Sequence, residues 1–133
     1  MTDKPLDRKR LYHVGNLSIF MIGLGFAVRA NIAPNLQGEI YDKIDLANSA
    51  AMVGAALGAT FTGFALTLLF GSALVDLIGM KRMLLLSALG YIAGAVGLLA
   101  GAMMPVSGMV ETVILFSLLL TGLGWGAVEA ASN

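Results

Sequence analysis

Long apolar runs alternate with short polar segments along the whole chain. The apolar runs cover residues 14–33, 49–75, 83–103 and 112–131. About 20 residues at a rise of 1.5 Å each cross the roughly 30 Å hydrocarbon core of a bilayer. A membrane β-barrel would instead need short segments in which apolar and polar residues alternate. The pattern therefore predicts an all-α integral membrane protein, a bundle of four transmembrane helices.

Polar residues and breakers set the expected ends of these helices. Residues 1–13 form a basic leader before the first run. Pro34 is expected to close the first helix, because proline cannot continue a hydrogen-bonded helix without cost. Residues 35–45 are expected to form a polar loop, after which Asp45 or Asn48 caps the second helix.

Glycines recur inside the apolar runs at a spacing of about four residues. They are Gly54, Gly58 and Gly63 in the second run and Gly90, Gly94, Gly97 and Gly101 in the third. Small residues at this spacing let helix backbones approach closely in lipid, so we expect these glycines to lie at helix contacts. The alternative is that glycine is simply more frequent in membrane helices.

Basic residues predict how the helices are oriented. The leader carries four bases, the segment before the second run one, residues 76–82 two, and the segment before the fourth run none. Positively charged segments stay in the cytoplasm. We therefore expect the N-terminus and residues 76–82 on the cytoplasmic side, in a bacterial inner membrane.

Composition excludes several classes of function. Of the 133 residues 58% are hydrophobic and 12% are charged, about half the charge of a soluble domain. Eight bases balance eight acids without a basic stripe, so no nucleic-acid partner is expected. There is no cysteine, and His13 is the single histidine, so neither a metal site nor a cofactor is expected. The sequence contains neither a nucleophile–base pair nor a phosphate-binding loop, so no enzymatic activity is expected.

Residues 72–82, between the second and third runs, hold one acid, one glycine and two adjacent bases. They resemble the loop between the second and third helices of the major facilitator superfamily, whose pattern is glycine, any, leucine, small, aspartate, basic, any, glycine, basic, basic. Asp76 falls on the aspartate, Gly79 on the second glycine, and Lys81 with Arg82 supply a basic pair. Three places depart from the pattern: Ser72, Leu77 and Met80.

The resemblance implies a role for this loop. In the family it is a conformational latch that holds the two halves of the transporter together on the cytoplasmic side, and Asp76, Gly79, Lys81 and Arg82 would form it here. From the residues alone, Gly79 permits a positive φ in a short turn. The two bases also fit a plain helical turn that sets the topology and contacts lipid phosphates.

Glu129 lies deep in the fourth apolar run with no base near it in the sequence. A carboxylate in hydrocarbon is costly, so we expect it to face the bundle interior or a water-filled path. Trp125 and Asn133 stand one turn to either side on the same helix face. An indole beside polar groups suits a sugar ring, and a buried carboxyl suits a proton-coupled carrier. The alternative is a Glu that extends to the cytoplasmic interface.

Residues 122–133 resemble the fourth helix of the fucose–proton symporter group, where a glycine-rich run leads to an acid and then an asparagine. Glu129 and Asn133 fall on those places, so the resemblance implies that Glu129 takes part in proton coupling. Leu118 stands where drug–proton antiporters carry an arginine, which disfavours that branch.

Arg29 and Asn31 lie in the outer part of the first run. A guanidinium that faces a cavity can bind a carboxylate or phosphate through two hydrogen bonds. The alternative is that Arg29 extends to the outer interface. The symporter group has an acid in this region, and this chain has none.

Together these features predict a secondary transporter that takes up a sugar or organic acid with a proton, by alternating access. Substrate would contact Arg29, Asn31, Trp125 and Asn133, while Glu129 exchanges the proton. Each half of such a transporter has six helices, so the expected partners are membrane lipid, the substrate, and either further transporter helices or other copies of the chain. The alternative is a small four-helix membrane protein that acts as an oligomeric exporter or interaction subunit.

Overall fold

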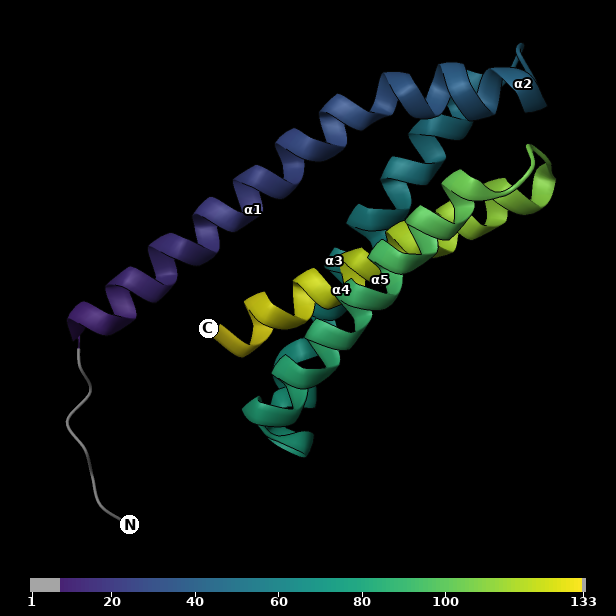
Figure 1. The fold of residues 1–133 in the computed structure, drawn as a ribbon. Helices are drawn as coiled ribbons and strands as arrows, with labels where there is room; N and C mark the ends of the chain where they lie inside the picture. The colour runs from purple at the N-terminus through teal and green to yellow at the C-terminus, as the bar shows by residue number, and fades with distance from the viewer. Residues whose placement is uncertain (1–7, 133) are drawn as a thin grey trace. The chain divides into compact units, whose positions relative to one another are not determined.

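Every element in the computed structural model, which describes residues 8–132, is a helix (Figure 1). The elements are α1 (Arg8–Leu36), the π-helix η1 (Gln37–Tyr41), α2 (Asp42–Ile44), α3 (Ser49–Ile78), α4 (Met80–Met103) and α5 (Gly108–Ser132). Within the described part, three helices are long and apolar enough to cross a membrane: α3 over Ser49–Gly71, α4 over Met80–Met103 and α5 over Gly108–Ala131. The helical membrane class is confirmed, whereas the fourth span, expected over residues 14–33, is not.

The chain divides into two compact units within α1. The first unit ends at Ile32 and the second begins at Ala33. The second unit therefore contains the end of α1 and the three candidate membrane helices.

The helix does not end at Pro34. Pro34 lies inside α1, and the chain stays helical through η1 and α2 as far as Ile44. The prediction of a polar loop over residues 35–45 is therefore wrong. Apolar side chains explain the continuation, since they recur at helical spacing and pack against α3 and α5 within the second unit: Ala33, Leu36, Ile40, Tyr41 and Ile44. Burying them offsets the backbone hydrogen bond that proline cannot donate.

A short turn over residues 45–48 leads into α3. Asp45 Oδ1 accepts hydrogen bonds from the backbone N–H groups of Ala47 and Asn48, at 3.1 and 3.3 Å. The side chain of Asn48, at the helix N-cap position, donates to Asp45 Oδ2 at 2.7 Å rather than capping the helix. Of the two predicted caps, Asp45 is thus the one whose carboxylate satisfies backbone donors, and it does so in the turn.

Helix α5 packs against both α3 and α4, which make little contact with each other (Figure 1). Half of the α5 span is buried, against 28% of the α3 span and 17% of the α4 span. α5 is therefore the central helix of the second unit, and most of α4 is left uncovered.

Glycine contacts give the directions of the three helices. Along α3, Gly63 lies against Leu119 and Gly71 against Ala130, so α3 and α5 run in the same direction. Along α4, Gly90 lies against Gly124 and Gly101 against Ile114, so α4 runs in the opposite direction. Successive helices thus reverse direction, as three consecutive membrane crossings must.

The glycine prediction is confirmed for most positions and wrong for two. The glycines of the third run all face α5: Gly90, Gly94, Gly97 and Gly101. Gly63 also meets the α5 backbone. Gly54 and Gly58, however, have no atom within 4 Å of the position that a Cβ would take, so they lie on a side of α3 that the second unit leaves uncovered.

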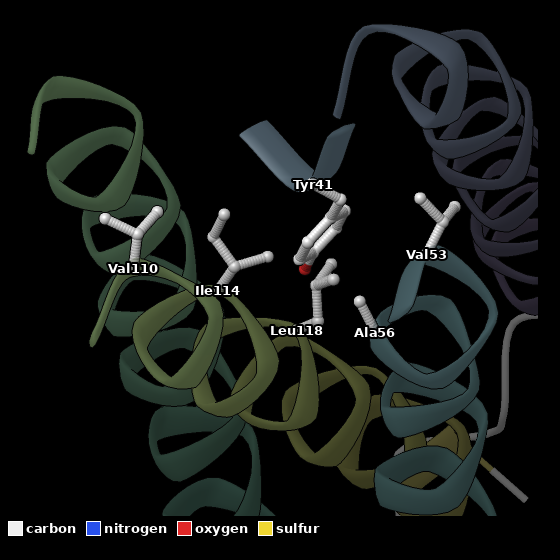
Figure 2. Close-up of a cluster of buried hydrophobic side chains, with 6 residues drawn as sticks. All are labelled: Tyr41, Val53, Ala56, Val110, Ile114 and Leu118. Atoms are coloured by element: carbon white, nitrogen blue, oxygen red, sulfur yellow. The ribbon is translucent and has the colours of Figure 1, made fainter. Parts of the chain in front are cut away.

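Buried apolar side chains form two clusters in the second unit. One gathers Tyr41, Val53, Ala56, Val110, Ile114 and Leu118 (Figure 2). It lies at the end where α3 and α5 begin. The other consists of Met83, Ala127 and Ala131, with Val75 and Ile78 packed against it, and lies beside the turn between α3 and α4.

Candidate functional site

One side of α5 carries two of the predicted site residues, Trp125 and Glu129. Ile114, Leu118, Trp125 and Glu129 follow one another at helical spacing and therefore share a side of the helix. Trp125 is 7% exposed, and its ring lies against that of Phe64 on α3, with centroids 5.2 Å apart and planes inclined at 51°. This is a favourable aromatic geometry. The indole thus contributes to the contact between α3 and α5, and its role in binding substrate stays a prediction.

Glu129 lies two residues before the end of the candidate membrane span of α5. It is half-buried and makes no hydrogen bond or ion pair within the described residues. Its neighbour Ala130 packs against Gly71, which is eight residues before the turn at Gly79. At 1.5 Å per residue, these eight residues place Ala130, and Glu129 beside it, about 12 Å from that turn along α3. A carboxyl at this depth stands within the candidate span of α5 rather than beyond its end.

The remaining predicted substrate contacts are divided among the units. Arg29 is half-buried and Asn31 is exposed, and both belong to the unit that ends at Ile32. Trp125 and Glu129 belong to the other unit. Asn133 lies outside the described residues. That these residues meet at one site stays a prediction.

The segment predicted as a latch loop is reduced to a single residue. α3 ends at Ile78 and α4 begins at Met80, so Gly79 alone joins two helices. Its φ of 85° and ψ of 148° lie in a region that only glycine adopts easily, which confirms the expected positive φ. Gly79 donates its N–H to Val75 O at 2.8 Å, and its own carbonyl accepts from Met83 N–H at 3.1 Å.

The charges beside Gly79 oppose the helix dipoles. Asp76 lies in the last turn of α3, where exposed carbonyl groups favour a cation. Lys81 and Arg82 lie in the first turn of α4, where exposed N–H groups favour an anion. All three side chains are exposed and form no ion pair with one another. These charges are therefore available to partners outside the described residues.

The opposite end of the second unit has its own polar groups. Lys43 Nζ donates to Glu39 Oε2 at 2.9 Å, and this hydrogen bond is the main cause of the lowered pKa of Glu39. The hydrogen bond from the Asn48 side chain lowers the pKa of Asp45. Burial raises the pKa of Tyr41 to about 12, and the negative charge of Glu111 adds to the rise. Tyr41 is therefore a neutral, fully buried phenol at physiological pH.

Sequence reasoning missed the hydroxyl groups that join the helices. Ser87 Oγ on α4 donates to Gly124 O on α5 at 2.6 Å, and Thr67 Oγ1 on α3 is 3.2 Å from Leu123 O. Tyr41 was also missed, because the segment that carries it was predicted to be a loop. The signal available was the apolar spacing around Tyr41, which is helical.

Within residues 8–132, no three His, Asp or Glu side chains stand close enough to hold a metal ion. The arrangement instead offers a half-buried carboxyl on a central helix. No family model, curated protein or solved structure matches the chain.

Proposed function

We propose that the chain is part of a proton-coupled secondary transporter of the major facilitator type, which takes up a sugar or organic acid across a bacterial inner membrane. The observation that carries the proposal is the position of Glu129, a half-buried carboxyl about 12 Å inside the turn at Gly79. A carboxyl within a membrane span is energetically costly, so its presence there favours a functional role.

The mechanism is alternating access. Substrate binds near the midplane between two helical bundles that rock around it. Glu129 takes up a proton from one side and releases it to the other. Trp125 and Asn133 line the substrate site beside it, and Arg29 with Asn31 binds or orients an anionic group of the substrate.

The turn at Gly79 acts as the latch that biases the two states. Asp76, Lys81 and Arg82 are exposed, and each opposes the dipole of its own helix, which costs about 0.3–1 kcal/mol per charge. Contact with a second bundle relieves this cost in one state only, with Asp76 meeting a cation or a helix N-terminus. Lys81 and Arg82 reach lipid phosphates in the other state.

Proton movement tests the role of Glu129. The native polypeptide is reconstituted in lipid vesicles that enclose a pH-sensitive dye, and fucose or lactate is added outside. We expect substrate-dependent acidification of the lumen, which Glu129→Gln abolishes. Glu111→Gln is the matched control, because Glu111 is also half-buried but lies in the first turn of α5. Unchanged acidification in Glu129→Gln would exclude this residue as the coupling site.

Cysteine labelling tests the orientation, because the chain has no cysteine of its own. Ala47→Cys and Lys81→Cys stand at opposite ends of α3. With the N-terminus in the cytoplasm, a membrane-impermeant maleimide labels position 47 in intact cells and position 81 only after the membrane is opened. Labelling of both positions in intact cells would contradict the predicted crossing.

The alternative function, a small oligomeric membrane protein, is favoured by one observation. The side of α3 away from α5 carries small residues that remain exposed or half-buried: Ala51, Gly54, Ala55, Gly58, Thr62 and Ala65. Such a surface suits close packing against another helix, here that of a second copy. Ala55→Cys should then cross-link into dimers, whereas Leu85→Cys on exposed α4 should not.

The mass of the native polypeptide separates the two functions. An immunoblot of the source membrane at 13.8 kDa supports the oligomer. A band at about three times that mass supports a transporter with two halves of six helices.

A further inference from the structure

Two buried hydroxyl groups between α3 and α5 have no hydrogen-bond partner within the described residues. The Tyr41 side chain is 0% exposed and Thr60 is 1% exposed, and neither Tyr41 Oη nor Thr60 Oγ1 is paired. Other threonines on α3 behave differently, since Thr62 donates to Gly58 O and Thr67 to Gly63 O. Burying a hydroxyl without a partner is costly, so such a pair calls for an explanation.

Both residues lie at the contact between α3 and α5. The ring of Tyr41 packs in one cluster with Ala56 and Leu118, and its hydroxyl points toward them (Figure 2). Thr60 lies one turn, about 6 Å, beyond Ala56 along α3. Gly122 lies one turn beyond Leu118 along α5 and is in contact with the Thr60 backbone. The two side chains thus occupy successive layers of one helix contact.

Helix geometry tilts the Thr60 side chain toward the layer of the Tyr41 hydroxyl. Side chains lean toward the N-terminus of their helix, and the N-terminus of α3 is the end near Tyr41. The Thr60 side chain therefore leans back toward the layer of Ala56, where the Tyr41 hydroxyl points. Two hydrogen bonds of about 2.8 Å each span at most about 5.6 Å, and the backward lean brings the Thr60 hydroxyl closer to the Tyr41 layer than the separation of about 6 Å between the layers.

The surroundings favour a small neutral ligand. The side chains that enclose Tyr41 are apolar: Val53, Ala56, Val110, Ile114 and Leu118. The charged group that acts on Tyr41 is Glu111, which lies one turn before Ile114 and Leu115 on α5. A ligand here must form a hydrogen bond with each hydroxyl and must be small enough to fit within a closely packed helix contact. Water meets these requirements.

We propose that Tyr41 and Thr60 bind one buried water molecule between α3 and α5, through which η1 is joined to the membrane helices. The water donates to one hydroxyl and accepts from the other. Helices α3 and α5, which meet through glycines, thus gain a polar contact at the end where Tyr41 packs against both of them.

Substitutions that remove the Tyr41 or the Thr60 hydroxyl but keep the shape of the side chain test the water site. Tyr41→Phe and Thr60→Val are compared with the wild-type chain by thermal unfolding in detergent. Each single substitution should lower the midpoint by a few degrees, because it leaves the bound water short of a partner. The double variant should unfold no lower than the less stable single variant, because both substitutions remove the same bridge.

The opposite changes in the unfolding midpoint would overturn the proposal. A midpoint that is unchanged or raised in either single variant means that its hydroxyl was simply unpaired, and additive losses mean that the two hydroxyls share no ligand. Tyr91→Phe and Thr62→Val are matched controls at exposed positions, and neither should change the midpoint by as much.

A second measurement applies even where a variant unfolds. In nuclear magnetic resonance spectra of the wild-type chain, the Tyr41 ring protons should show a cross-peak to a slowly exchanging water. The absence of this cross-peak would overturn the proposed water site. Glu111→Gln should leave the effect of Tyr41→Phe on the unfolding midpoint unchanged. Non-additive effects of these two substitutions would mean that the Tyr41 hydroxyl interacts with Glu111 rather than with a water.

Discussion

The hydroxyl of Ser87 on α4 donates a hydrogen bond of 2.6 Å to the carbonyl oxygen of Gly124 on α5. Ser87 is 2% exposed, and a Cβ at Gly124 would lie 2.8 Å from the Ser87 carbonyl oxygen. The glycine thus allows the helices to approach closely enough for the hydroxyl to reach across. Because Ser87 is buried at this contact, the loss of its hydrogen bond should have measurable consequences.

Ser87→Ala should lower the free energy of unfolding by about 0.6–1.7 kcal/mol, the range for hydrogen bonds between membrane helices. The loss arises because the alanine keeps the shape but cannot donate to Gly124 O. Equilibrium unfolding in detergent measures it. Thr62→Ala is the control, because the Thr62 hydroxyl is exposed and bonds within its own helix. Equal losses in the two variants would contradict a contribution from the contact between helices.

Gly94→Ala should destabilise the unit by about 1–3 kcal/mol through overpacking. A Cβ at position 94 would lie 2.5 Å from Thr121 Cγ2 and 2.6 Å from Ser117 O, and the carbonyl oxygen belongs to a rigid backbone. Gly54→Ala is the matched control, because no atom lies within 4 Å of its Cβ position. That control should be neutral or stabilising by up to about 1 kcal/mol from helix propensity. Thermal midpoints of the two variants in one detergent check the contrast.

Gly79→Ala should cost about 1–3 kcal/mol, because its φ of 85° and ψ of 148° strain any residue with a Cβ. There is space for the methyl group, so the effect measures backbone strain alone. Gly108→Ala, which also has open space and lacks the positive φ, serves as the control. Should both variants unfold at the wild-type midpoint, the single-residue turn is incorrect.

Stability should fall as pH rises from about 10 to about 12. Burial raises the pKa of Tyr41 from 10.0 to about 12, so over this window the folded chain keeps a proton that the unfolded chain releases. The stabilisation is complete below pH 10 and is lost by up to about 1.4 kcal/mol per pH unit above it. Chemical unfolding at each pH measures the slope. Tyr41→Phe should remove this dependence, whereas Tyr91→Phe, at an exposed tyrosine, should retain it.

The sequence predicted the elements whose causes are local. A membrane span must satisfy its backbone hydrogen bonds within its own helix, so the apolar runs indicate α3, α4 and α5 almost to their ends. The positive φ of Gly79 follows from a glycine between two long helices. Glu129 was recognised as unusual because charge in an apolar run is visible without any structure. Its depth relative to the turn came from the packing of Ala130 on Gly71.

The tertiary structure alone decided which faces are in contact. Gly54 and Gly58 have the same four-residue spacing as Gly90 and Gly94, yet only the second pair meets a neighbouring helix. Lipid tails are as apolar as leucine, so an apolar helix face carries no signal of whether lipid or protein will cover it. Tyr41 and the helix beyond Pro34 follow the same rule, since burial against α3 and α5 outweighs what proline predicts locally. Local pattern therefore fixed the helices of this protein, and packing fixed its core, because only packing distinguishes one apolar surface from another.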